Sequence, residues 1–434
     1  MIRSGWIFVG GVAGLLLLAA DTMAQDSLLP QTAPTVSRQD WPWWRGPRRN
    51  GHAPGNQQPP LKWSAQQNVI WKAPLPGRGH SSPIVVGDEV FLATAEEDKQ
   101  IQSVICLDRN FGTQRWITPV HEGDFVFEGN DKSSQASSTV ACDGERLFIN
   151  FLNNNMVYTT ALDRKDGRPL WQTPIHKYKV HQGYASSPFL YGKLVIVSAD
   201  NKGEGGGAIV ALDRNSGKEV WRQPRPQEPN YASPIVIHSA GMDQLIMIGC
   251  DHIASHLPLT GKQLWNIEGA TTECVTSPVS DGQLVFSSGG YPKNHVAAVR
   301  MDGSGDVVWE NNTRVYVPSL ILRDGYLYAT ADAGVAMCWN AKNGKEMWKG
   351  RLGGTFSASP VVMDDLLYAT NEEGQTFIFK AQPGEFELVA ENELGTEVFA
   401  TPAICGSRIY MRVAQYDGDQ RQEWLYCLGN GTAQ

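Results

Sequence analysis

The sequence predicts an all-β protein: a single β-propeller of eight four-stranded blades, whose last blade is closed by a strand from the N-terminal part of the chain. Three observations support this fold class. A glycine followed four residues later by a tryptophan recurs along the chain, and successive tryptophans are 39 to 55 residues apart. Eight candidate strands begin with a hydroxyl residue, and turn signals separate many short strands. Repeats of this length are typical of propeller blades and solenoids, and closely spaced short strands indicate an all-β chain.

Tryptophan follows a glycine by four residues in six successive units, and in three of them an aspartate precedes that glycine by a further four. An aspartate at the start of a hairpin caps its own turn, and glycine adopts the positive φ that a tight loop requires. A decayed copy retains Lys380, Gly384 and Leu388. The tryptophans of this structural ladder are Trp71, Trp116, Trp171, Trp221, Trp265, Trp309 and Trp348.

Each unit also contains a serine or threonine that starts an apolar strand, and proline follows it in six of the eight cases. Proline is tolerated at the first residue of a strand, because its missing N–H breaks no hydrogen bond of the sheet there. These starts mark the innermost strand of each blade. They are Ser82, Thr139, Ser187, Ser233, Ser277, Ser319, Ser359 and Thr401.

The numbers of strand starts and hairpins predict how the ring closes. Eight starts are matched by only seven tryptophan-type hairpins, because the last unit stops at Leu428 near the C-terminus. Residues 68–71, which end at Trp71, supply an outer strand with no blade of its own. The last blade is therefore predicted to combine three C-terminal strands with this N-terminal one, which protects edges that would otherwise pair with other chains.

The start of the chain is predicted to be a signal peptide over residues 1–24. Arg3 precedes an uncharged run that extends to Ala20, and small residues before Gln25 resemble a cleavage site. The mature protein is therefore expected to be exported, periplasmic or extracellular. An uncleaved membrane anchor is the alternative, although the run is slightly short for a bilayer span.

Residues 25–61 are predicted to form a tether and a tryptophan-rich strap, followed by the propeller over residues 62–430. The segment from Trp41 to Arg49 places aromatic rings among arginines. The net charge of −8 argues against nucleic acid as a partner. We therefore interpret this segment as a strap whose tryptophans lie against the propeller, and we expect a monomer.

The seven cysteines do not form a recognisable disulfide framework. Cys106, Cys338 and Cys427 occupy a column that other units fill with alanine, which indicates small core residues. The remaining four have no obvious partner, and one bridge among them stays open. No Cys-x-x-Cys or cysteine and histidine spacing typical of a metal site is present.

The long insertions all fall on one face of the predicted ring, which we call the long-loop face. They cover residues 94–103, 119–137, 172–186 and 199–207. Long loops gathered on one side of a rigid scaffold are typical of a binding surface.

Residues just before the innermost strands are expected to surround the mouth of the central channel on this face. They are His80, Tyr184, Tyr231, Glu273, Tyr316, Phe356, Glu397 and Phe399. Aromatic rings together with two carboxylates suit a planar or peptide ligand. The same rings would equally serve as packing between blades, and the glutamates as solvated rim charges, so both interpretations stay open.

The repeat resembles a known family. The DxxxGxxxW ladder preceded by SPxxxxxxxY is similar to the PQQ-type propeller repeat of quinoprotein dehydrogenases and of the outer-membrane β-barrel assembly lipoprotein. Residues 41–51 (WPWWRGPRRNG) and residues 289–292 further resemble exported PQQ-like propellers of planctomycete-type bacteria. The resemblance covers residues 62–430 and implies a fold without certifying that a cofactor binds.

What the resemblance implies about activity depends on which parts of a quinoprotein site are present. The resembled dehydrogenases carry a vicinal cysteine pair, a calcium ion held by carboxylate and amide oxygens, and an aspartate base. This sequence has no adjacent cysteines. We therefore expect no catalytic residue, no metal and no cofactor, and a scaffold that binds a protein or peptide partner in the cell envelope.

Two alternatives to this scaffold stay open. A dehydrogenase dependent on PQQ and calcium would use His80, Glu273 and Glu397 for contacts with the metal and the cofactor. The other alternative is a propeller that binds a carbohydrate or another small molecule.

Overall fold

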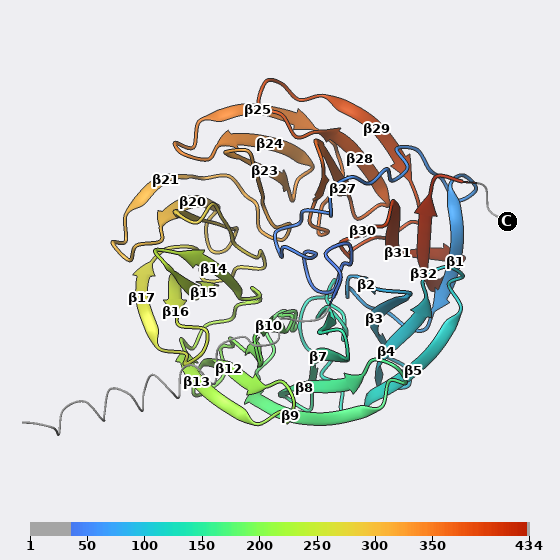
Figure 1. The fold of residues 1–434 in the computed structure, drawn as a ribbon, viewed down its shortest axis with the longest axis horizontal. Coiled ribbons are helices and arrows are strands. Elements are labelled where there is room, and N and C mark those ends of the chain that lie inside the picture. The colour runs from blue at the N-terminus through green and yellow to red at the C-terminus, as the bar shows by residue number, and fades with distance from the viewer. Residues whose placement is uncertain (1–35, 432–434) are drawn as a thin grey trace, which may run out of the picture.

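The computed structural model describes residues 36–431, which form eight four-stranded antiparallel sheets arranged as the blades of a ring (Figure 1). The predicted signal peptide and the first part of the tether lie outside the described residues. Within this range all regular structure is strand, and no helix has the length and apolarity of a membrane span. The predicted all-β, eight-bladed propeller is therefore confirmed.

The first four blades along the chain each consist of four consecutive strands, with the first strand innermost (Figure 1). Their bounds are β2 (Ile84–Val86), β3 (Glu89–Glu96), β4 (Ile101–Asp108) and β5 (Gln114–Glu122); β6 (Ala141–Cys142), β7 (Arg146–Asn153), β8 (Met156–Asp163) and β9 (Pro169–Lys177); β10 (Phe189–Tyr191), β11 (Leu194–Ser198), β12 (Gly207–Asp213) and β13 (Glu219–Arg225); β14 (Ile235–Ser239), β15 (Met242–Gly249), β16 (His252–His256) and β17 (Gln263–Glu268).

The next three blades follow the same order, and the last one closes the ring. Their bounds are β18 (Val279–Ser280), β19 (Leu284–Gly289), β20 (His295–Arg300) and β21 (Val307–Asn311); β22 (Ile321–Arg323), β23 (Tyr326–Ala331), β24 (Val335–Asn340) and β25 (Glu346–Arg351); β26 (Val361–Met363), β27 (Leu366–Thr370), β28 (Gln375–Lys380) and β29 (Leu388–Glu393); β30 (Ala403–Cys405), β31 (Arg408–Asp417), β32 (Gln420–Gly429) and β1 (Val69–Leu75).

The closing blade joins the two ends of the propeller. Strand β1 pairs antiparallel with β32, and Trp71 lies opposite Cys427. The sheet order β1-β32-β31-β30 is the predicted combination of one N-terminal and three C-terminal strands. All seven cysteines are buried and free, so no disulfide supports this closure.

The glycine and tryptophan of the ladder make contacts between neighbouring blades. The spacing of these residues within one unit did not reveal such contacts. Gly261 has a φ of 71° in the turn before β17, and the Trp221 ring of the preceding blade packs directly on it. The indole Nε1 of Trp221 also donates to the carbonyl oxygen of Pro258 in the same turn, at 3.0 Å. The glycine therefore forms the turn and also leaves room for the tryptophan of the blade before it.

The hydroxyl residues that start the innermost strands are linked from blade to blade. The backbone N–H of Ser82, for example, donates to Oγ1 of Thr139 at 3.1 Å. Six such bonds, each between 2.9 and 3.1 Å, join successive blades around the channel. At these six acceptor positions a short hydroxyl side chain is favoured, because its oxygen accepts the N–H of the neighbouring start.

The strap crosses the middle of the ring, where its blue trace runs in front of the innermost strands (Figure 1). Trp41 exchanges two backbone hydrogen bonds of 2.8 Å with Val85 of β2. Arg49 lies between the rings of Trp43 and Phe189, 4.0 and 3.8 Å from their centroids. The strap also accepts backbone N–H groups from Gly87, just after β2, and from Cys142, the last residue of β6. These two contacts are at the strand ends away from the long-loop face, so the strap covers the opposite opening of the channel.

Candidate functional site

A cavity of about 300 Å³ occupies the channel on the long-loop face. Its floor includes Trp44 of the strap, whose indole Nε1 donates to Oγ of Ser277 at 2.9 Å. Hydroxyls of the inner ring surround the cavity above this floor, and loop residues 130–137 and 182–185 form its rim. Because the strap closes one end, a ligand can reach the cavity from the long-loop face.

Five of the eight predicted mouth residues line this cavity, namely His80, Tyr184, Tyr231, Tyr316 and Phe399. The blades that carry Tyr184, Tyr231 and Tyr316 lie across the ring from the closing seam, where His80 and Phe399 are placed. The cavity therefore has aromatic walls on opposite sides. The other three predicted residues do not line it.

Phe356 is buried, with 1% of its surface exposed, and its ring packs on Phe377 of the same blade at a centroid distance of 6.2 Å. Its backbone N–H donates to the carbonyl oxygen of Asp332. Phe356 thus has the packing role that was the alternative interpretation of the mouth aromatics.

Glu273 is a buried carboxylate that holds one wall of the cavity in place. Its Oε2 accepts a hydrogen bond from the Tyr316 hydroxyl at 2.8 Å, and its Oε1 lies 3.1 Å from Nε2 of His181. Nζ of Lys202 lies 2.7 Å from the other ring nitrogen of His181, which assigns the proton of the neutral ring to Nε2. Burial and the adjacent Glu273 raise the pKa of Tyr316, so its hydroxyl stays protonated and continues to donate.

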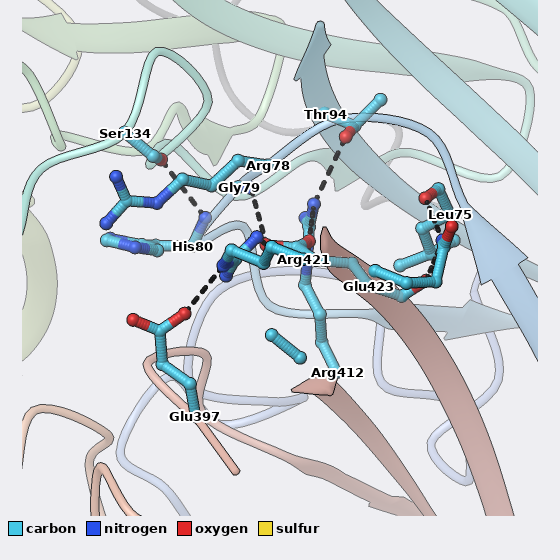
Figure 2. A network of polar contacts seen from close by, with 12 residues as sticks. Leu75, Arg78, Gly79, His80, Thr94, Ser134, Glu397, Arg412, Arg421 and Glu423 are labelled. Carbon is cyan, nitrogen blue, oxygen red and sulfur yellow. Dashed lines mark hydrogen bonds and ion pairs between the residues drawn. The ribbon is translucent and has the colours of Figure 1, made fainter. Parts of the chain in front are cut away.

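Glu397 belongs to a polar network at the seam between the closing blade and the first blade (Figure 2). Its Oε2 accepts a hydrogen bond from Nε of Arg421 at 2.7 Å, and Arg421 also contacts Glu423. Glu423 forms a buried ion pair with Arg412 at 2.5 Å and accepts the backbone N–H of Gly79 at 3.2 Å. The network fixes the segment that leads into the first blade, so Glu397 is neither a solvated rim charge nor a lining residue.

His80 comes directly after Gly79 in the chain, and it lines the cavity. Its ring lies 4.5 Å from that of Phe399, tilted by 30°. Burial and the cations of Arg78, Arg412 and Arg421 hold the pKa of His80 well below its ordinary value. The imidazole is therefore uncharged at neutral pH, and its Nε2 is buried without a hydrogen-bond partner.

The described residues that line the cavity include no carboxylate, and the ammonium group of Lys132 is paired with Glu372 at 2.6 Å. Calcium takes six to eight oxygen ligands, usually with carboxylates among them. Across residues 36–431, moreover, no three His, Cys, Asp or Glu side chains gather as a metal-binding group. The residues of the mouth therefore do not fit a quinone held by calcium.

Sequence reasoning missed several residues of the site. The strap contains no repeat, so nothing in the spacing indicated that Trp44 reaches the inner hydroxyl ring. His181 lies 92 residues from Glu273 in the chain and comes from the connection between β9 and β10, which carries no repeated pattern. The hydroxyl starts were found as strand markers, but their position on the cavity wall required the ring geometry.

Comparison with known proteins places this geometry in context. A family profile described as "Outer membrane protein assembly factor BamB" matches residues 62–183, 102–350 and 292–386. A curated relative, 1-butanol dehydrogenase (quinone) from Thauera butanivorans, is 27% identical over 154 residues, which are 34% of this chain and 23% of that enzyme. The chain thus matches less than a quarter of that relative's length.

Solved structures show the same fold. BamB from Moraxella catarrhalis is 15% identical, with a TM-score of 0.58 over 82% of this chain and 96% of that one. Quinohemoprotein alcohol dehydrogenase from Comamonas testosteroni is 12% identical, with a TM-score of 0.65 over 96% of this chain and 85% of that one. The computationally designed Ika8 protein is also similar, with a TM-score of 0.55 at 12% identity over 85% of this chain and 99% of that one. At these identities the similarity establishes the architecture alone.

Proposed function

Because the chain belongs to the family described as outer membrane protein assembly factor BamB, we propose that it is an exported, non-catalytic propeller that binds a protein partner across its long-loop face. The family description refers to protein assembly at a membrane. A rigid ring with variable loops on one side suits that task, because the scaffold fixes loops that recognise the partner.

The observation that carries this proposal is the difference between the two faces. The strap covers one opening of the channel, whereas the cavity and the long insertions lie on the other. Three exposed aromatic side chains stand on this second face, Phe127 and Tyr291 in loops and Tyr416 near the end of β31, and they are 62%, 53% and 50% exposed. Aromatic residues are enriched in the anchor positions of protein interfaces.

The carboxylates of the mouth also favour binding over catalysis. Glu273 is held by Tyr316 and His181, and Glu397 by Arg421. Both therefore have structural partners and neither reaches the cavity lining. A general base must lie within hydrogen-bond reach of the proton that it removes, and these two groups are directed elsewhere.

The proposal is tested by capturing the partner with the exported, affinity-tagged chain from its native envelope. A variant with Phe127→Ser, Tyr291→Ser and Tyr416→Ser should lose the partner, because three exposed anchors are removed without touching the core. Phe111→Ser is the matched control, since Phe111 is 74% exposed on the strap face. Equal recovery of the same partner by the triple variant and the wild type would contradict the proposal.

The partial similarity to a quinone-dependent butanol dehydrogenase supports one competing function, a dehydrogenase that uses PQQ and calcium. Binding at a hundred times the dissociation constant stabilises a fold by about 2.7 kcal/mol. We expect PQQ with calcium to leave the unfolding temperature of the chain unchanged. A dose-dependent increase would favour the enzyme over the scaffold.

A further inference from the structure

Three residues that line the cavity each have a buried polar atom without a hydrogen-bond partner: Nε2 of His80, Oγ of Ser82 and the hydroxyl oxygen of Tyr231. The backbone N–H of Gln182 faces the Tyr231 hydroxyl but does not close a hydrogen bond with it. Tyr231 and Ser82 are only 6% and 2% exposed. Unpaired buried polar groups are costly, so three of them around one cavity indicate a ligand that carries hydrogen-bonding groups.

The inner hydroxyl ring adds donors to the same wall. Thr139, Ser187 and Ser359 line the cavity. Each uses its oxygen to accept the backbone N–H of the preceding blade, at 3.1, 3.0 and 3.0 Å. A hydroxyl group has one proton and two acceptor positions, so each retains a proton for a second partner. The ligand should therefore present several oxygen atoms toward the ring.

The ring of hydroxyl links is interrupted at two of its eight positions, and one of these gaps lies beside the unpartnered atoms of His80 and Ser82. Oγ of Ser82 would be the acceptor of the link from Thr401, but it is unpartnered, whereas Ser82 itself donates to Thr139. This gap lies at the closing seam next to His80 and Phe399. Two of the three orphaned atoms, on His80 and Ser82, thus lie at the closing seam, across the ring from the third, the Tyr231 hydroxyl.

The aromatic walls indicate that the ligand also has an apolar face. Tyr184 and Tyr316 have their hydroxyls committed to Ser198 and Glu273. They therefore offer mainly ring surface to the cavity, as Phe399 does. An aromatic ring attracts the slightly positive hydrogens of C–H groups to its face. The cavity volume of about 300 Å³ lies at the lower end of the range for small-molecule sites, which suits one ring rather than a chain of rings.

The charge of the lining indicates that the ligand is uncharged. Lys132 is paired with Glu372, His80 is neutral, and no carboxylate is among the described lining residues. A charged ligand would enter without a counter-ion, and desolvation of an unpaired charge is strongly unfavourable.

We propose that this cavity binds one uncharged sugar ring, stacked on the tyrosine and phenylalanine walls with its hydroxyl groups on His80, Ser82, Tyr231 and the inner serine and threonine ring. A sugar ring combines an apolar C–H face with many neutral hydroxyls, and the cavity matches both. An aromatic side chain of a partner peptide would fill the space but would leave most of the unpaired atoms without a bond. This site is separate from the exposed anchors of the long-loop face and stands whether or not a protein docks there.

The test is calorimetric titration of the mature chain with the methyl glycosides of glucose, galactose, mannose and N-acetylglucosamine. At least one should bind with a Kd in the millimolar range or below. Tyr231→Phe and Ser82→Ala should each weaken that binding about fivefold, the effect of one lost hydrogen bond. Tyr368→Phe is the matched control, because the Tyr368 hydroxyl is also buried and unpartnered but lies away from the cavity.

Several outcomes would overturn the proposal. It fails if no glycoside binds, or if binding is unaffected by both Tyr231→Phe and Ser82→Ala. Tighter binding of methyl glucuronide than of methyl glucoside would reject an uncharged ligand. Binding of N-acetyltyrosinamide in place of the glycosides would assign the cavity to a side chain of the protein partner. Capture of that partner by the wild type and its loss in the triple aromatic variant of the long-loop face test the proposed function independently.

Discussion

Replacing Gly261 by alanine should destabilise the propeller through the tryptophan of the preceding blade. A Cβ atom at Gly261 would lie 2.5 Å from Cε3 and 2.7 Å from Cδ2 of Trp221, and the residue has a φ of 71°. The left-handed conformation costs an alanine roughly 1–2 kcal/mol, and overpacking against a fixed ring adds about 1–3 kcal/mol. The free energy of unfolding should therefore fall by about 2–5 kcal/mol.

Gly241 in the same blade provides the matched control. Its φ is 77°, but an added Cβ would meet nothing within 4 Å. Gly241→Ala should therefore show only the conformational cost, roughly 1–2 kcal/mol. The difference between the two variants, measured by guanidinium unfolding, isolates the contact between blades.

Equal destabilisation by Gly261→Ala and Gly241→Ala would refute the contact between Trp221 and Gly261, because backbone strain alone would then account for the loss of stability in both variants. A double variant sharpens the result, because Trp221→Leu shortens the side chain that the new methyl group would strike. The Gly261→Ala penalty should be smaller in that background, which is a measurable coupling. Trp221→Ala alone should cost about 3–5 kcal/mol through the cavity that it leaves.

Three further predictions follow from the strap, the seam and His121. Arg49→Lys should cost about 1 kcal/mol in unfolding experiments, because it replaces a guanidinium stacked between two rings, whereas the exposed Arg48 should tolerate the same change. Glu423→Gln should cost about 3–5 kcal/mol by leaving the buried Arg412 unpaired, and adding Arg412→Met should recover much of that loss. Burial lowers the pKa of His121 to about 4, so below about pH 6.5 the unfolded chain takes up a proton that the folded chain does not. Stability should therefore fall between pH 7 and 5, and His121→Gln should remove about 2 kcal/mol of that decline, which unfolding curves at both pH values would check.

The architecture was predictable because the residues that build the ring repeat in nearly every blade. Trp71 at the N-terminal end completes the ladder, and its pairing with β32 is the closure that the unequal numbers of starts and hairpins indicated. The seven free cysteines likewise agree with the missing disulfide framework. The strand-start hydroxyls and the ladder tryptophans recur in nearly every unit, so counting them gives the number of blades and shows which blade is closed by an N-terminal strand.

The parts that sequence could not supply are contacts between distant, unrepeated segments. Trp221 packs on the glycine of the following blade, and an offset within one unit does not reveal a contact between units. Glu273 contacts His181, which lies in the insertion over residues 172–186. Trp44 donates to Ser277, which is 233 residues away in the chain. The pattern before the inner strands therefore predicted five lining residues together with three that serve the packing and polar networks behind the wall.

Cross-linking from the two faces tests the central claim, that the long-loop face binds the partner, most directly. A photoreactive benzoylphenylalanine would replace either Phe127 on that face or Phe111 on the strap face, two exposed phenylalanines at opposite ends of β5. On illumination of intact cells, we expect one discrete protein adduct from position 127 and none from position 111. An adduct from position 111 alone, or the same adduct from both positions, would contradict it.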